Sequence, residues 1–257
     1  FVAGHDRGGR VAHRLARDHR QRVIAMSILD ICPTLDMYEA TDMEFARSYF
    51  HWYFLIQPRG LPEKMIESDP RAWVDSCLQK WSGGREFGPA EEAYLAAFSQ
   101  PERIHASCED YRAAAGIDLE HDRADRDQLL NIPIQVLWGK HGVIGRKFSP
   151  IKVWQAYTTE KVSGCAMPTG HFIPEEDPKG VITKLNNFFL SFSIVDKSEC
   201  NWVKRSKPNR LSKPVLMSSE LLSGWAKFSI FSPSKKNKSD NRGKTNRIKR
   251  RQKNLLE

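Results

Sequence analysis

The 257-residue chain contains no hydrophobic run that approaches the roughly 18 to 20 apolar residues of a membrane-spanning helix. We also find no charged and then apolar leader ahead of a cleavage site. Cysteine is scarce, and the five cysteines follow neither CxxC nor Cys/His ligand spacing: Cys32, Cys77, Cys108, Cys165 and Cys200. The sequence therefore predicts no membrane partner, no disulfide framework and no zinc site, and we expect a cytoplasmic protein.

Acidic residues are scarce toward the end of the chain. Residues 195–257 carry 17 Lys and Arg but only 5 Asp and Glu, whereas residues 1–194 carry 23 and 26, so the net charge of +9 arises from the tail. Residues 232–254 are also poor in apolar side chains, and such a composition cannot form a packed core. We predict that 195–257 is a basic, disordered tail. Because runs of charge are usually solvated, we do not expect nucleic acid as a partner.

Hydrophobic periodicity divides the rest of the chain into strands and helices. Short apolar runs predict strands at residues 1–3, 22–29, 132–138 and 161–167, and helical patterns occupy 8–19 and 179–192. Between 34 and 130 the pattern is helical, with start signals at Pro62-Glu63, Pro89-Ala90-Glu91 and Pro101-Glu102.

This order predicts an α/β fold with a parallel sheet and an inserted helical cap. We place the core at 1–33 and 131–194 and the cap at 34–130. Four strands are few for such a sheet, and the chain starts inside a strand, so we expect a fragment that lacks the N-terminal strands.

The first turn carries the most informative motif. Gly4-His5-Asp6-Arg7-Gly8 fits the nucleophile-elbow pattern G-x-S-x-G with aspartate in place of serine. We expect the two glycines to permit a cramped strand-to-helix turn that exposes Asp6. A carboxylate with a pKa near 4 is ionised at neutral pH and can displace a leaving group directly from carbon. The alternative is that Asp6 is only a helix N-cap.

An ester formed on Asp6 would need a general base for its hydrolysis. His171 follows the last predicted strand in PTGHF, at the carboxyl edge of the sheet, and is our candidate. Residues 138–143 contain no carboxylate to orient it. Asp30, at the end of the second strand, can serve instead and keeps the chain order of nucleophile, acid and histidine, although it could also be a turn residue before Pro33.

With these residues in place, the chain resembles the fluoroacetate and haloacetate dehalogenases of the α/β-hydrolase superfamily over residues 1–192. The stretches that carry the resemblance are GHDRGGR (4–10), LDICPT (29–34), ARSYFHWYF (46–54), IHASCEDYRAAAGID (104–118) and GHF (170–172). The resemblance implies the α/β-hydrolase fold and a triad of Asp6, Asp30 and His171. It also implies that the protein hydrolyses short 2-haloacids and that this reaction needs neither a metal nor an organic cofactor. The resemblance further implies that the protein forms a homodimer.

The same resemblance assigns the substrate contacts. Arg7 and Arg10 correspond to the arginines that hold the substrate carboxylate, which agrees with the bidentate chemistry of guanidinium groups. His51, Trp52 and Tyr111 correspond to the residues that bind the halide, and each can donate a hydrogen bond.

Two other interpretations stay open. Epoxide hydrolases share the aspartate nucleophile and use cap tyrosines to activate the epoxide, and five tyrosines are candidates here: Tyr38, Tyr49, Tyr53, Tyr94 and Tyr111. Arg7 and Arg10 disfavour this interpretation, because an epoxide has no carboxylate for them to bind. The second interpretation is an inactive remnant, or an interaction protein whose tail binds nucleic acid.

Overall fold

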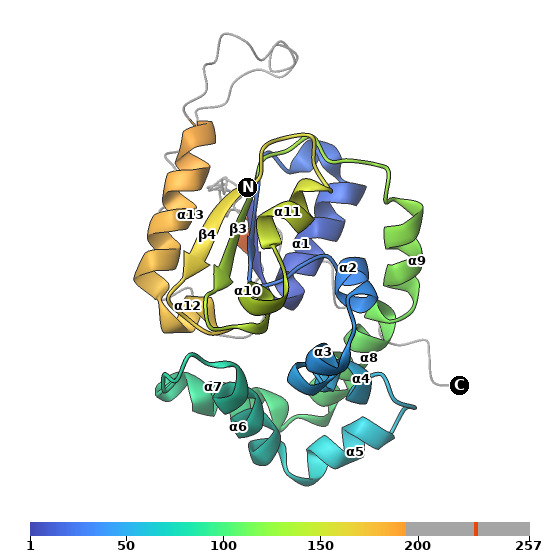
Figure 1. Cartoon of the computed structure of the whole chain (residues 1–257). Helices are drawn as coiled ribbons and strands as arrows, with labels where there is room; N and C mark the ends of the chain where they lie inside the picture. The colour runs from blue at the N-terminus through green and yellow to red at the C-terminus, as the bar shows by residue number, and fades with distance from the viewer. Residues whose placement is uncertain (194–228, 231–257) are drawn as a thin grey trace, which may run out of the picture.

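The computed structural model describes residues 1–193 and the short segment Ser229–Ile230 (Figure 1). The prediction of a disordered tail at 195–257 therefore lies outside the described residues, apart from Ser229–Ile230. Among the described residues, no helix is long and apolar enough to cross a bilayer.

The central sheet has the strand order β4-β3-β2-β1-β5. The first four strands in the chain are parallel to one another and match the predicted positions: Val2–His5 (β1), Met26–Leu29 (β2), Ile134–Gly139 (β3) and Ser163–Met167 (β4). Ser229–Ile230 (β5) pairs antiparallel with β1, with Val2 opposite Ile230. This strand lies within the stretch that we predicted to be disordered, so that prediction is wrong for these two residues.

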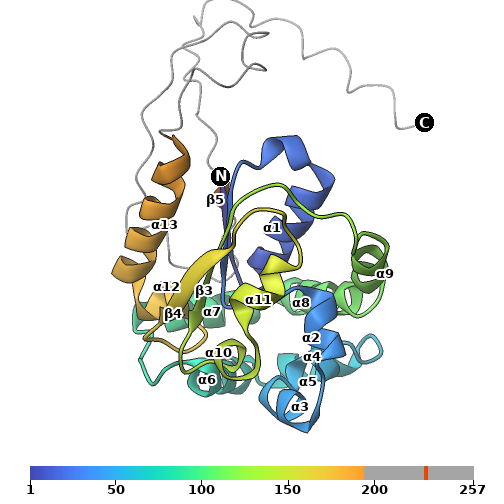
Figure 2. The same ribbon diagram turned by 45° about the horizontal axis from the view of Figure 1, so that its top comes forward.

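Helices cover both faces of the sheet, as an α/β architecture requires (Figures 1 and 2). One face packs against Arg7–Asp18 (α1) and Pro150–Gln155 (α11), and the other against Pro178–Ser193 (α13). Strand residues alternate between the faces: Ile28 points to the first face and Leu29 to the second. Shorter helices complete the core: Arg20–Arg22 (η1), Val143–Lys147 (α10) and Ile173–Glu176 (α12).

The insertion between β2 and β3 consists of eight helices. In Figure 1, α3 to α8 cluster below the carboxyl ends of the strands, α2 lies to the side at the level of these ends, and α9 rises beside the core. Their bounds are Thr34–Glu39 (α2), Met43–Ser48 (α3), His51–Phe54 (α4), Leu61–Ser68 (α5), Pro70–Trp81 (α6), Pro89–Phe98 (α7), Pro101–Ala114 (α8) and Ile117–Ala124 (α9). The three predicted start signals lie at the beginnings of α5, α7 and α8. Proline suits this position because the backbone N–H groups in the first turn of a helix have no acceptor within the helix, so the missing N–H of proline costs no hydrogen bond there.

The turn between β1 and α1 is tight, and it requires one of the two glycines that we predicted for it. A Cβ atom on Gly4 would lie 2.3 Å from the backbone oxygen of Gly8, so Gly4 must be glycine. A Cβ on Gly8 would meet nothing within 4 Å. The expectation that Gly8 is needed for space is therefore wrong. The second close approach belongs to Gly9, where a Cβ would lie 2.7 Å from Ile31 Cγ2.

The two glycines should consequently respond differently to substitution. We expect Gly4→Ala to lower the free energy of unfolding by about 1 to 3 kcal/mol, because the added methyl forces the backbone of α1 away from β1. Gly8→Ala should change it by less than about 1 kcal/mol, since alanine fits and favours the helix. Urea denaturation of the full chain measures both values. Equal destabilisation by the two substitutions would contradict this account of the turn.

Candidate active site

Asp6 occupies the turn between β1 and α1 in an unusual backbone conformation. Its φ is 49° and its ψ is −120°, a region that residues other than glycine rarely adopt. The turn is held by the backbone, because Asp6 N donates to Leu29 O at 3.0 Å and Asp6 O accepts from Gly9 N at 2.9 Å. Such strain typically costs about 1 to 3 kcal/mol and persists only where the surroundings impose it. Its effect here is to present the carboxylate at the edge of the sheet, where the side chain is 24% exposed.

The structure brings Asp6, Asp30 and His171 together from segments far apart in the sequence. His171 Nδ1 lies 2.7 Å from Asp30 Oδ2, and His171 Nε2 lies 3.7 Å from Asp6 Oδ2. Asp30 is completely buried, and its other oxygen accepts from Gly139 N at 2.8 Å. Asp30 thus fixes the orientation of the imidazole, and the opposite ring nitrogen faces Asp6. This arrangement can support a carboxylate nucleophile and a histidine base.

The charges of the triad stabilise one another. Burial favours the neutral form of His171, but the carboxylates of Asp30 and Asp6 outweigh burial and raise its pKa to about 10. Burial likewise opposes ionisation of Asp6, yet the interactions with His171, His5 and Arg10 bring its pKa well below the usual range. The site therefore contains an ionised Asp6 carboxylate beside an imidazolium.

Arg7 and Arg10 lie close to Asp6 and carry unsatisfied hydrogen-bond donors. Arg7 Nη1, Arg10 Nε and Arg10 Nη1 are buried and have no hydrogen-bond partner among the described residues. Arg10 stacks on the ring of Trp52, with its Cζ 4.1 Å from the ring centroid. Burial and the charge of Arg7 together lower the pKa of Arg10 to about 10, so the guanidinium is still charged at neutral pH. Buried cationic donors without a partner are costly, and an anion would relieve that cost.

The three predicted halide contacts line a cavity of about 40 Å³ together with Asp6 and His171. Since a cavity needs about 10 to 15 Å³ to hold one water molecule, this cavity has room for only a few non-hydrogen atoms. His51 is buried, which lowers its pKa to about 3, and its Nδ1 has no partner among the described residues. His51 is therefore neutral and can donate one N–H. The centroid of its ring lies 5.5 Å from the centroid of the Tyr111 ring.

A wider cavity of about 320 Å³ adjoins the inner one and shares Asp6, Phe98, Ser107, Tyr111 and His171 with it. Arg7 lines this outer cavity, whereas Arg10 lines neither of the two. The structure thus places Arg7 at the wall and Arg10 behind Trp52. The predicted site residues converge on one place, although the two arginines are not equivalent.

Sequence reasoning missed a buried carboxylate that supports the histidine. Glu176 accepts hydrogen bonds from Gly83 N and Gly170 N, both at 2.8 Å, and from Phe172 N at 3.1 Å. It fixes the loop that carries His171 and joins this loop to the end of α6. No local signal in FIPEE reveals the role, because two of the three donors come from outside that stretch.

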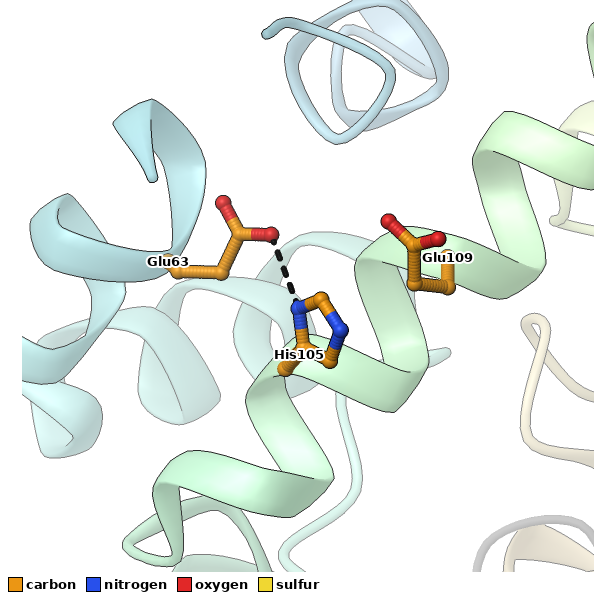
Figure 3. A group of neighbouring side chains, drawn as sticks. All are labelled: Glu63, His105 and Glu109. Atoms are coloured by element: carbon orange, nitrogen blue, oxygen red, sulfur yellow. Dashed lines mark hydrogen bonds and ion pairs between the residues drawn. The ribbon is translucent and has the colours of Figure 1, made fainter. Parts of the chain in front are cut away.

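A second group of titratable side chains lies in the cap, where ligand atoms of Glu63, His105 and Glu109 lie within 4.8 Å of one another (Figure 3). Arg112 Nη1 donates to both glutamates at 2.7 Å, and His105 Nδ1 lies 3.3 Å from Glu63. The guanidinium already supplies the positive charge that a metal ion would bring. We therefore interpret the group as an ion-pair network that joins α5 to α8.

The protonation state of His171 can be tested directly. We expect its ring to stay protonated at pH 7.5 in a ¹H–¹⁵N NMR titration, and Asp6→Asn to lower its pKa because one of the two carboxylates is removed. The raised pKa also stabilises the fold below pH 6.5, and this contribution should be lost as the pH rises toward 10.

Asp127→Asn is the matched control, since it removes an exposed carboxylate elsewhere. If the pKa of His171 were ordinary in the wild type, or unchanged in Asp6→Asn, the described coupling would be wrong.

No protein-family model matches the chain. Individual proteins are nevertheless similar to it in sequence. Fluoroacetate dehalogenase from Burkholderia sp is 39% identical over 190 residues, which are 73% of this chain and 62% of that protein. Soluble epoxide hydrolase from Corynebacterium sp. (strain C12) is 28% identical over 193 residues, 73% of this chain and 66% of that protein. The chain thus spans less than two thirds of the length of either relative.

Solved structures agree with these relatives. A crystal structure of a protein from Nostoc sp PCC 7120, assigned as an alpha/beta hydrolase, has a TM-score of 0.71 and 50% sequence identity. The match covers 74% of this chain and 65% of that one. The comparison supports the predicted α/β-hydrolase fold.

Proposed function

The chain has the α/β-hydrolase fold and is a homologue of fluoroacetate dehalogenase, and on this basis we propose that it hydrolyses the carbon–halogen bond of short 2-haloacids such as haloacetate. The observation that carries the proposal is the pair of buried arginines with unpartnered nitrogens beside the ionised Asp6. A carboxylate on the substrate would satisfy Arg7 Nη1 at the wall of the outer cavity, and the charge of Arg10, which lines neither cavity, would attract it from behind Trp52. The inner cavity of about 40 Å³ favours a molecule with very few non-hydrogen atoms.

In the first step, a carboxylate oxygen of Asp6 attacks the α-carbon and the carbon–halogen bond breaks. The halide leaves with the bonding electron pair, and Asp6 becomes a neutral alkyl ester. His51, Trp52 and Tyr111 line the cavity in which the halide would separate and can donate hydrogen bonds to it. The neutral state of His51 suits this role, since the ring can offer N–H without a proton transfer.

Ester formation would also activate the base. In the resting site, His171 is protonated because two carboxylates face it. Once Asp6 is esterified, one of these charges is lost, so the pKa of His171 falls and the ring releases its proton to solvent. Neutral His171 then takes a proton from water while the oxygen attacks the ester carbonyl carbon. The hydroxy acid leaves, and Asp6 regains its charge.

Two variants separate the steps. We expect Asp6→Asn to lower chloride release from chloroacetate at least about 1000-fold, because the nucleophile is lost. His171→Gln should form the ester but not hydrolyse it, so mass spectrometry of the intact protein should find a carboxymethyl group on Asp6. Chloride release that is unchanged in Asp6→Asn would refute the mechanism.

The epoxide alternative rests on the likeness to soluble epoxide hydrolase and on Tyr111, which lines the inner cavity. Arg10 discriminates between the two functions. We expect Arg10→Met to lower kcat/KM for chloroacetate about 10- to 100-fold. Leaving the substrate carboxylate without this positive charge costs about 1.5 to 3 kcal/mol, and each 1.4 kcal/mol corresponds to a factor of about ten. Hydrolysis of propylene oxide should be negligible in the wild type. Rapid opening of the epoxide, unaffected by Arg10→Met, would favour the alternative.

A further inference from the structure

Arg7 is held by one residue of the cap. The carboxylate of Asp110, in α8, accepts from Arg7 Nε, and the backbone oxygen of Asp110 accepts from Arg7 Nη2 at 2.7 Å. Arg7 begins α1 in the core, so this contact joins the core to the cap across 103 residues of sequence. The two hydrogen bonds approach from the same residue and restrain the guanidinium plane as well as its position.

The contact determines which part of Arg7 remains for a ligand. With Nε and Nη2 engaged, Nη1 is the nitrogen that is buried without a partner among the described residues. The neighbouring residue, Tyr111, packs its ring against the same guanidinium at 4.4 Å. One turn of α8 therefore orients Arg7 and also supplies a wall of the inner cavity.

We propose that Asp110 is a positioning residue that aims Arg7 Nη1 at the substrate carboxylate and so determines the preference for charged over neutral substrates. This inference rests on the proposed function. Asp110 lines the outer cavity, while Asp6, Tyr111 and His171 line both cavities. Asp110 thus acts through Arg7 and from outside the inner cavity.

A purely structural role would predict something different. The Asp110 side chain is 46% exposed, and ion pairs with exposed partners add little to stability. Loss of the carboxylate should consequently leave the melting temperature almost unchanged. Loss of the carboxylate leaves Arg7 with only the Nη2 bond to the backbone oxygen of Asp110, however, so the guanidinium plane is no longer fixed and recognition of a carboxylate by Nη1 weakens.

The test compares Asp110→Ala and Asp110→Asn with the wild type in the full chain. For Asp110→Ala we expect kcat/KM for chloroacetate to fall about tenfold, mostly through KM, and the Kd for acetate to rise by a similar factor. For chloroacetamide, a neutral analogue, kcat/KM should change less than about twofold. Asp110→Asn retains an acceptor oxygen for Arg7 Nε and should recover part of the loss.

Glu92→Gln is the matched control, because Glu92 forms an exposed ion pair with Arg71 in the same cap. It should leave both substrates and acetate unaffected. Equal losses for chloroacetate and chloroacetamide in Asp110→Ala, or a large fall in melting temperature, would overturn the positioning role.

Acetate binding separates this inference from the proposed function. If the wild-type chain binds acetate but releases no chloride, the proposed hydrolysis of haloacids is contradicted. The role of Asp110 in orienting Arg7 is then still tested by the effect of Asp110→Ala on the Kd for acetate. A wild-type chain that does not bind acetate overturns both. An acetate Kd that is unchanged in Asp110→Ala overturns the inference, even if chloride release is normal.

Discussion

The candidate site depends on the buried carboxylate of Asp30. One of its oxygens accepts from Gly139 N at the end of β3, and the other contacts His171 Nδ1 in the loop after β4. Asp30 itself follows β2 with a φ of 48°, a strained conformation that costs about 1 to 3 kcal/mol. Removing one partner of a buried charged pair commonly costs about 3 to 5 kcal/mol. This side chain therefore holds the ends of three strands in register as well as orienting a histidine.

The electrostatics of the site follow from that arrangement. A protonated His171 lies between two carboxylates, while the buried Arg7 and Arg10 lie nearby with donors that the described residues do not satisfy. Burial alone would discharge most of these groups, and the opposite charges around them prevent it. His51 lacks such a partner and is neutral. The site thus combines fixed charges with one uncharged donor, which suits a small anionic substrate in the proposed reaction.

Much of this could be predicted from the sequence, and the reasons are local. The parallel sheet and its inserted helices follow from apolar periodicity and from proline at helix starts, and the comparisons confirm this fold class. The elbow motif led to Asp6, and the ends of predicted strands led to Asp30 and His171, because parallel strands bring their carboxyl ends to one edge. The structure places these three side chains together; their catalytic roles stay predictions.

Other features depend on tertiary contacts that no local pattern encodes. Glu176 binds Gly83, 93 residues away, and Asp110 binds Arg7, 103 residues away. The need for glycine at position 4 rather than 8 depends on which atoms approach across the turn. The unequal placement of Arg7 and Arg10 depends on the packing of Trp52. Each of these requires the relative position of the core and the cap.

The cap is attached to the core unequally at its two sides. At the end of α6, the backbone of Trp81 accepts from His171 N at 2.8 Å, and the buried Glu176 binds Gly83. At α8, by contrast, Arg7 is held by Asp110, whose side chain is 46% exposed. Because local opening starts where few buried contacts must break, the α8 side should loosen first and the α6 side should act as the pivot. In the proposed reaction, a substrate anion would then enter beside Arg7, while the loop that carries His171 stays anchored.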